Sequence, residues 1–146
     1  MFITNELKRQ VSDLLEGLTT RVNWLQSLAG REDDWEQDLT YLLAAERALH
    51  TSVEYTTDIG SLIIDALVMR DPGSYADIIK VLVEEQVLPE AWFQEFEPIF
   101  PLRARFIRDH AHIKPAEVKN AVQAHAHQFT IFVNCIRRYL DLPAQI

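Results

Sequence analysis

The chain has 146 residues and a formal net charge of −8 at pH 7. This acidic balance argues against general binding to DNA, to other nucleic acids or to anionic lipid, so any contact with a polyanion must be local. Hydrophobic residues make up 48% of the sequence and charged residues 25%, values typical of a globular protein, and the length predicts one domain spanning residues 1–146.

Three further features bear on localisation. No apolar run approaches the roughly 18–20 residues needed to cross a bilayer, so we expect no membrane association. The first ten residues, MFITNELKRQ, lack the pattern of a signal peptide. Cys135 is the single cysteine, which excludes an internal disulfide and is typical of a reducing compartment. The sequence therefore predicts a cytoplasmic protein.

The first half of the chain shows two long helical patterns. Leucine and valine recur at steps of three and four residues between Asn5 and Gly30, which predicts one helix that is capped at Asn5 and stops at Gly30. A second pattern begins near Asp33 or Asp34 and reaches Met69, about 35 residues and roughly 50 Å if unbroken. Gly60 lies within it, and we expect a close neighbour there rather than a kink, since no proline accompanies it.

Turn and cap signals divide the second half. Asp71-Pro72-Gly73 predicts a turn, after which Ser74 caps a short helix that runs from Tyr75 to about Gln86. Another helix starts at Pro89, is interrupted at Pro98 and Pro101, and is followed by a fresh helix. The last helix opens at Pro115, and Pro143 closes the tail.

These patterns predict an all-α fold, an antiparallel bundle of four long helices and at least one short one. The overlong second helix and the aromatic residues Trp92, Phe93, Phe96 and Phe100 favour burial against a second copy of the chain. Burial of the same aromatic residues in the protein's own core is the alternative. Because two-fold homodimers are the commonest oligomers, we expect a homodimer.

A basic island interrupts the acidic sequence. Residues 103–119 hold five basic and two acidic residues, a net charge of +3, which leaves nine basic and twenty acidic residues elsewhere, a net charge of −11. Summed positive charge raises the local concentration of an anion, and histidine adds a side chain that titrates near neutrality. The island is therefore a candidate site for a phosphate or RNA; a solvated helix face is the alternative.

The sequence around this island resembles a known family. The stretch AAERALHTSVEYTTDIGSLIIDALVMRDPGSYADIIKVLVEEQVLPE and the later PLRARFIRDHAHI are similar to the HepT-like branch of the HEPN superfamily, from about Trp35 to Leu140. MRDPGSYADII most resembles a subgroup found in Bacillus-type bacteria. The resemblance implies a dimerising helical bundle that cleaves RNA without metal at an R-x4-6-H motif in the dimer cleft. It also implies a minimal nucleotidyltransferase antitoxin as partner, which in the best-studied type adds AMP units to a motif tyrosine.

Carried over residue by residue, the family motif departs from its usual form. The motif arginine falls on Arg103, Ala104 stands in place of the usual polar residue, Arg108 in place of the histidine and His110 in place of the tyrosine. The bare formula is still met, because six residues separate Arg103 from His110 and four separate Arg105 from His110. The resemblance therefore implies a degenerate ribonuclease motif that lacks the tyrosine acceptor.

Metal-free RNA cleavage needs a base, a cation for the charged phosphorane, and an acid. On an unbroken helix, Arg103 and His110 lie within about 20° of one stripe, whereas Arg105 and His110 differ by about 140°. We therefore take Arg103 as the phosphate-binding cation and His110 as the proton-transfer group. The candidate catalytic residues are Arg103, His110 and Arg108, and the candidate RNA-binding residues are Arg105, His112 and Lys114.

Two alternatives stay open. Arg103 could pair with a carboxylate of the second helix while His110 and His112 are exposed terminal residues. A catalytically silent relative would instead bind a nucleotidyltransferase, RNA or a nucleotide. We expect no metal or cofactor, because the histidines of each H-A-H pair, at 110/112 and 125/127, point in nearly opposite directions on a helix. For Glu46, Asp58 and Asp65 of the second helix we expect ion pairs with Arg47, Arg103 or Arg105.

Overall fold

The computed structural model describes residues 2–143, which contain helices and connecting loops and no strand. Three helices are long: α1 (Asn5–Ala29), α2 (Leu39–Ala66) and α6 (Pro115–Tyr139). Three are short: α3 (Tyr75–Glu84), α4 (Glu90–Phe96) and α5 (Ile99–Arg108). Single 3-10 turns precede α2 and α6, namely η1 (Trp35–Gln37) and η2 (His110–His112).

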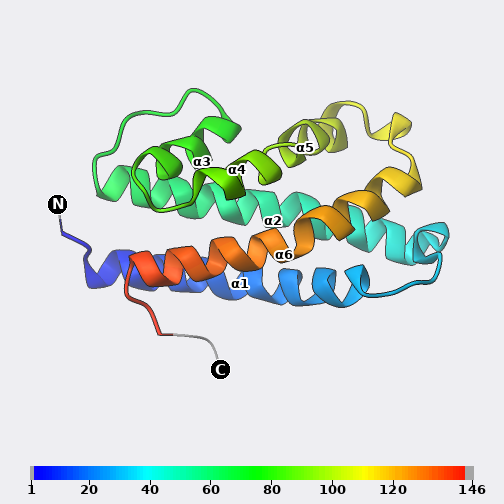
Figure 1. Ribbon diagram of the computed structural model, residues 1–146, viewed down its shortest axis with the longest axis horizontal. Helices are drawn as coiled ribbons and strands as arrows, with labels where there is room; N and C mark the ends of the chain where they lie inside the picture. Colours follow the sequence, from blue (N-terminus) through cyan, green and yellow to red (C-terminus); the bar gives the residue numbers. More distant parts are fainter. Residues whose placement is uncertain (1, 144–146) are drawn as a thin grey trace.

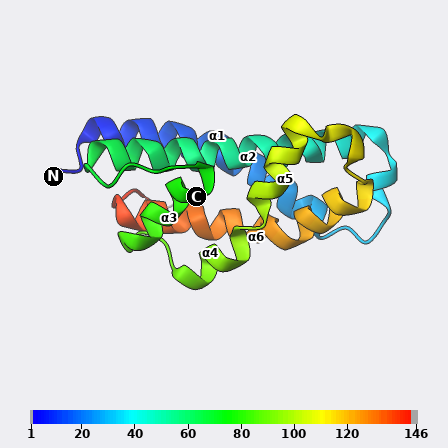
Figure 2. The same ribbon diagram turned by 90° about the horizontal axis from the view of Figure 1, so that it is seen from above.

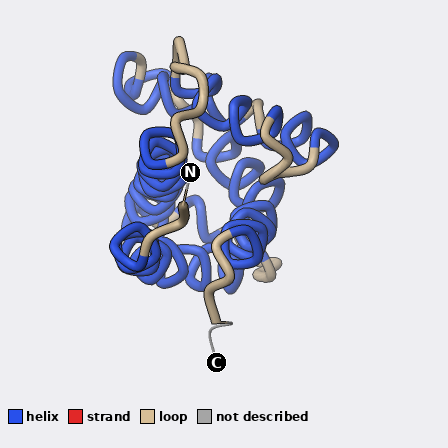
Figure 3. Tube along the Cα trace, turned by 90° about the vertical axis from the view of Figure 1, so that its left-hand side faces the viewer, coloured by secondary structure: helices blue, strands red, loops and turns tan. Residues whose placement is uncertain are grey.

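The helices form an antiparallel bundle. In Figure 1, α1, α2 and α6 run along the length of the molecule, and α3, α4 and α5 follow one another back along α2. The view from above in Figure 2 shows the same course, with α5 lying over α2. Seen from the end in Figure 3, the helices surround a shared interior. The predicted all-α antiparallel bundle is confirmed. Three of the four expected long helices are present, and the short helices α3, α4 and α5 together take the place of the fourth.

The second helix is shorter than its hydrophobic pattern predicts. It has 28 residues instead of about 35, and it begins at Leu39 rather than near Asp33 or Asp34. The start is later because Trp35–Gln37 forms a 3-10 turn and Asp38, in an extended conformation, caps the helix by accepting a hydrogen bond from the backbone N–H of Thr40 at 2.9 Å. With this length, α2 barely exceeds the 25 residues of α1 and α6.

The local start and stop signals mostly act where the sequence places them. Ser74 caps α3 by accepting a hydrogen bond from the N–H of Asp77, and Pro115 opens α6. Pro98 separates α4 from α5 because a proline ring clashes with a preceding helical turn and lacks an N–H donor. The first helix is capped one residue earlier than predicted, by the hydroxyl of Thr4 instead of Asn5.

The aromatic residues of α4 and α5 pack inside their own chain. Phe96 is fully buried, stacks on Trp92 with ring centres 4.6 Å apart and meets Phe129 edge-on at 5.3 Å. Phe93 and Phe100 are buried as well. Their burial against a second copy was therefore the wrong expectation, and the alternative, the protein's own core, is confirmed. The cause is geometric: α4 and α5 fold back over α6 and α2, so the rings face inward.

Gly60 lets α3 approach α2 closely, as predicted. A Cβ atom added at this position would lie 2.8 Å from Cγ2 of Ile78, well inside van der Waals contact. The close approach fixes the start of α3 beside α5, where Tyr75 is placed. Within residues 2–143, no helix is both long and apolar enough to cross a membrane.

Candidate functional site

Arg103 is held at the point where α2, α3 and α5 meet. Its Nε–H donates a hydrogen bond to Oε1 of Glu54 on α2 at 2.6 Å, and its guanidinium carbon lies 3.5 Å from the centre of the Tyr75 ring. The Arg103 side chain is 14% exposed and that of Glu54 31% exposed. The predicted alternative, an ion pair between Arg103 and a carboxylate of the second helix, is confirmed. The guanidinium is nevertheless only partly enclosed.

A cavity of about 380 Å³ lies beside this pair, between the start of α3 and α5. Arg103 and Arg108 both line it, together with Ser74, Tyr75 and Ile107. The structure thus brings together two of the three candidate catalytic residues. Two arginines at one cavity are suited to a phosphate, because the planar fork of an arginine can meet two oxygens at once.

His110 lies elsewhere. Helix α5 ends at Arg108, and Asp109 breaks the helical geometry, so His110 starts the η2 turn and is exposed. The expectation that Arg103 and His110 share one helical stripe is therefore wrong, because it required an unbroken helix. Among residues 2–143, no hydrogen bond or ion pair joins the two side chains.

His110 lies within electrostatic reach of Glu46 on α2. Burial raises the pKa of the Glu46 carboxyl, and the nearby His110 opposes this rise. Glu46 precedes Glu54, the partner of Arg103, by eight residues, which is about 12 Å along a helix. Arg103 and His110 therefore lie over different parts of α2, about two turns apart.

The three candidate RNA-binding residues differ in how many contacts their side chains already make within the protein. Arg105 is tied to the start of α6, because it forms an ion pair with Glu117 and donates to the carbonyl of His112 at 3.1 Å. This pairing raises the pKa of Arg105 and lowers that of Glu117. His112 is exposed and pairs with Asp109, and Lys114 is exposed beside them.

Sequence reasoning missed His50. Its Nε2 lies 3.5 Å from Oε1 of Glu54, the oxygen that also accepts from Arg103, and its ring stacks on Phe106 with centres 6.2 Å apart. A signal was present in the sequence, because Glu46, His50 and Glu54 recur every four residues and therefore share one face of α2. Tyr75 was missed too, and only the tertiary packing of α3 reveals its place beside Arg103.

The remaining acidic and histidine residues make other contacts. No group of three or more histidine, cysteine or acidic side chains suited to a metal ion occurs within the described part of the chain. The expected ion pairs of Glu46, Asp58 and Asp65 do not form there; Glu54 takes that role, and burial raises the pKa of Asp58. His125 is buried in α6, where its Nδ1 lies 2.6 Å from Oε1 of Gln128.

Comparison with known proteins shows the family to which this chain belongs. Residues 18–136 match the model of the family described as ribonuclease HepT-like. The chain therefore belongs to the HepT-like family of the HEPN superfamily. A protein of Bacillus subtilis (strain 168) with the name "Putative RNase YutE" is 31% identical over 115 residues, which cover 79% of both chains.

Solved structures agree with this assignment. The structure of the cytosolic protein YutE from Bacillus subtilis matches with a TM-score of 0.83 and 27% identity, covering 99% of both chains. A tri-AMPylated HEPN toxin from Shewanella oneidensis, solved in complex with its MNT antitoxin, matches with a TM-score of 0.79 over 92% of this chain and 99% of the other. At 18% identity, the second likeness shows the fold alone.

Proposed function

We propose that this protein is a toxin-type endoribonuclease that cleaves RNA without a metal ion at a cleft between two copies of the chain. Arg103 and Arg108 bind phosphate in this scheme, and His110 transfers protons. The observation that carries the proposal is that Arg103 and Arg108 line one cavity on α5. Membership of the HepT-like family and the name of the Bacillus subtilis relative support it.

The chemistry fits the residue types. Cleavage by the 2′-hydroxyl builds a doubly charged phosphorane, which fixed guanidinium groups stabilise strongly in a partly enclosed site. A positioned imidazole contributes roughly 10²–10⁴-fold to the rate by moving protons. Because His110 lies about two helical turns from the Arg103 pair along α2, the substrate must be long enough to contact both. A strand of several nucleotides meets this requirement, which favours RNA over a mononucleotide.

Exposed apolar side chains near the site support the homodimer. Leu43 of α2 is 54% exposed and Ile107 of α5 is 48% exposed, and both line hollows beside α5. Large apolar side chains exposed next to a functional surface are typical of an interface. A second copy covering them would close the cleft over the two arginines.

We further propose that the protein acts in the cytoplasm and that its partner is a minimal nucleotidyltransferase antitoxin. The solved HEPN toxin that shares this fold is in complex with such an antitoxin, and the YutE structure is described as that of a cytosolic protein. Position 110 is a histidine, so AMP transfer to a tyrosine hydroxyl cannot take place there. An AMP adduct found on His110 by mass spectrometry would contradict this view.

One observation favours a second candidate function, a catalytically silent protein that binds a nucleotidyltransferase, RNA or a nucleotide. Glu54 and Tyr75 already hold Arg103, as they would a structural residue, and Arg108 occupies the place of the motif histidine. In such a protein the α5 surface would bind its partner without cleaving it. The two functions differ in one effect on growth: expression of the ribonuclease should harm the host cell and should need His110, whereas expression of the silent protein should not.

Induced expression in a bacterial host tests the toxin proposal. We expect growth arrest with the wild-type chain, relief with Arg103→Ala or His110→Ala, and neutralisation by a nucleotidyltransferase encoded next to the gene. The control is His127→Ala, which removes an exposed histidine of α6 and should leave the arrest intact. Harmless accumulation of folded wild-type protein would refute the toxin role and favour the silent alternative.

A further inference from the structure

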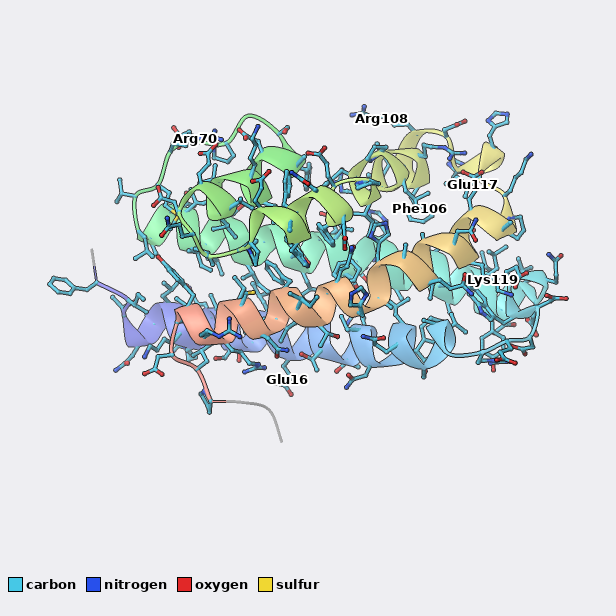
Figure 4. All side chains as sticks on the ribbon, viewed as in Figure 1. Glu16, Arg70, Phe106, Arg108, Glu117 and Lys119 are labelled. Carbon is cyan, nitrogen blue, oxygen red and sulfur yellow. The ribbon has the colours of Figure 1, made fainter. Side chains whose placement is uncertain are left out.

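A second hollow lies on the other side of the α2–α5 contact. Its volume is about 160 Å³, and Leu43, Glu46, Arg47, His50 and Phe106 line it. Figure 4 shows Phe106 on the side of α5 that faces α2, whereas Arg108 extends away from the bundle. The hollow therefore combines a cation, an imidazole, a carboxylate and an aromatic ring, all outside the arginine cavity already described.

His50 has a neighbour on two sides in this hollow. Phe106 stacks on its ring at a 27° interplanar angle, and Glu54 faces its Nε2. No hydrogen bond to the other ring nitrogen, Nδ1, is found among residues 2–143, and the side chain is 22% exposed. A carboxylate near one ring nitrogen favours one orientation of the ring and leaves the second nitrogen free to exchange a proton, as an acid–base histidine requires.

A second imidazole lies next to the same hollow. Phe106, which lines the hollow, precedes His110 by four residues across the end of α5, and His110 lies near enough to Glu46, one helical turn from His50, to lower the pKa of that carboxyl. Glu46 is thus the common neighbour of His50 and His110. RNA cleavage without a metal needs one group to accept a proton and another to donate one, and one imidazole in the hollow with a second near it can divide these tasks.

We propose that this hollow is the RNA subsite where the protons move, with Arg47 on the phosphate, His50 as the base and His110 as the acid. The inference rests on the proposed ribonuclease function and deepens it. The arginine cavity then binds a neighbouring phosphate of the same strand, and Glu54 joins the two subsites because Arg103 and His50 share its Oε1 atom.

The reaction balances without an added cofactor. Neutral His50 takes the proton of the 2′-hydroxyl, and the 2′-oxygen forms a bond to phosphorus. The bond between phosphorus and the 5′-oxygen breaks, and protonated His110 gives its proton to that oxygen. The products are a 2′,3′-cyclic phosphate and a 5′-hydroxyl, and one proton exchange with water restores both histidines.

Replacement of His50 tests the base. We expect His50→Gln, which keeps a similar size but cannot titrate, to lower the rate of cleavage of single-stranded RNA in EDTA at least 100-fold. The low-pH limb of the rate profile should disappear with it. The charged groups that face His50 are Glu46, Arg47 and Glu54 of α2. Arg103 of α5 lies beyond Glu54, and His110 of η2 lies beyond Glu46. The pH–rate profile is therefore also measured with His110→Gln, so that the contribution of His110 is separated from that of His50.

The control is His127→Gln on α6, which should cleave as the wild type does, and circular dichroism establishes that each variant is folded. His50→Ala is the second variant, and added imidazole should restore part of its activity if the missing group acts on protons. A folded His50→Gln protein that cleaves within threefold of the wild-type rate overturns the proposal.

Binding separates this proposal from the ribonuclease function itself. The probe is a 2′-O-methyl RNA oligonucleotide, which cannot be cleaved because it lacks the attacking hydroxyl. Arg47→Ala should weaken binding about tenfold, and Arg138→Ala, an exposed arginine of α6, should not. If wild-type protein binds RNA but does not cleave it, the ribonuclease function and the proton step both fall. In that case the phosphate subsite is supported only by the weaker RNA binding of Arg47→Ala. If Arg47→Ala binds RNA as tightly as the wild type, the phosphate subsite is wrong as well.

Discussion

Arg103 of α5 and His50 of α2 meet at the same oxygen of Glu54, at 2.6 Å and 3.5 Å. The carboxylate accepts a hydrogen bond from the guanidinium and faces the imidazole at ion-pair distance, so it lies between the two groups. Its exposed fraction of 31% keeps the pair within reach of solvent. Glu54, a single acidic residue on α2, thus contacts both the arginine of α5 and the histidine of α2.

Glu54→Gln should lower kcat for RNA cleavage about 10- to 100-fold while leaving KM unchanged or lower. The loss follows because a small misplacement of positioned groups costs up to about 100-fold in rate, whereas removal of a negative charge does not weaken RNA binding. Steady-state kinetics on a short RNA measure both constants. Glu95→Gln, an exposed carboxylate of α4, is the control, and an unchanged kcat for Glu54→Gln would remove Glu54 from the site.

Arg108→Ala should weaken RNA binding uniformly across sequences and lower the slope of log K against log salt concentration by about one. The reason is that each phosphate contact by an arginine releases about one counterion from the nucleic acid. Fluorescence anisotropy with the 2′-O-methyl oligonucleotide at several salt concentrations gives this slope. If Arg108→Ala and Arg138→Ala show the same slope as the wild type, Arg108 does not contact phosphate.

The fold could be predicted from the sequence because its signals are local. The three- and four-residue spacing of apolar side chains, the Ser74 cap and the proline breaks each act within a few residues. The start of α2 was misplaced because the buried Trp35 continues the apolar pattern into a 3-10 turn, so periodicity alone cannot mark the boundary at Asp38.

The site was only partly predictable, for the opposite reason. Arg103 and Arg108 were identified from the basic island, and both line one cavity. The predicted pairing of Arg103 with His110 required the helix to continue as far as His110. Helix α5 instead ends at Arg108, and Asp109 departs from helical geometry. The four-residue spacing of Glu46, His50 and Glu54 places these side chains on one face of α2, but only tertiary contacts show that Glu54 and Tyr75 are the partners of Arg103.

Gly60→Ala should lower the free energy of unfolding by about 1–2 kcal/mol. The added Cβ would lie 2.8 Å from Ile78, and such overpacking costs about 1–3 kcal/mol, which outweighs a helix-propensity gain of up to about 1 kcal/mol. Urea denaturation measures the change. Gly30→Ala is the matched control, because its nearest neighbour would be 3.7 Å away; equal stability of the two variants would contradict the close α2–α3 contact.

The buried His125 should make the protein less stable as the pH falls below about 6.5. Burial lowers the pKa of His125 in the folded chain, so between that lowered value and the ordinary pKa of about 6.5 the unfolded chain binds more protons. Stability is thus full above this window and declines through it. His125→Leu should be less stable at pH 7, because Gln128 loses its partner, but its urea midpoint should change less between pH 7 and pH 5. His127→Leu should alter the slope less than His125→Leu, because His127 is the smallest of the causes that shift the pKa of His125, and an equal slope for both variants would refute the assignment.

The most direct test of the central claim is cleavage of single-stranded RNA by the purified protein in EDTA, beside Arg103→Ala, His110→Ala and the His127→Ala control. The account predicts cleavage by the wild type and the control, with the rate reduced at least 100-fold in each of the other two variants. Intact RNA after incubation with folded wild-type protein, or equal cleavage by His110→Ala, would contradict it.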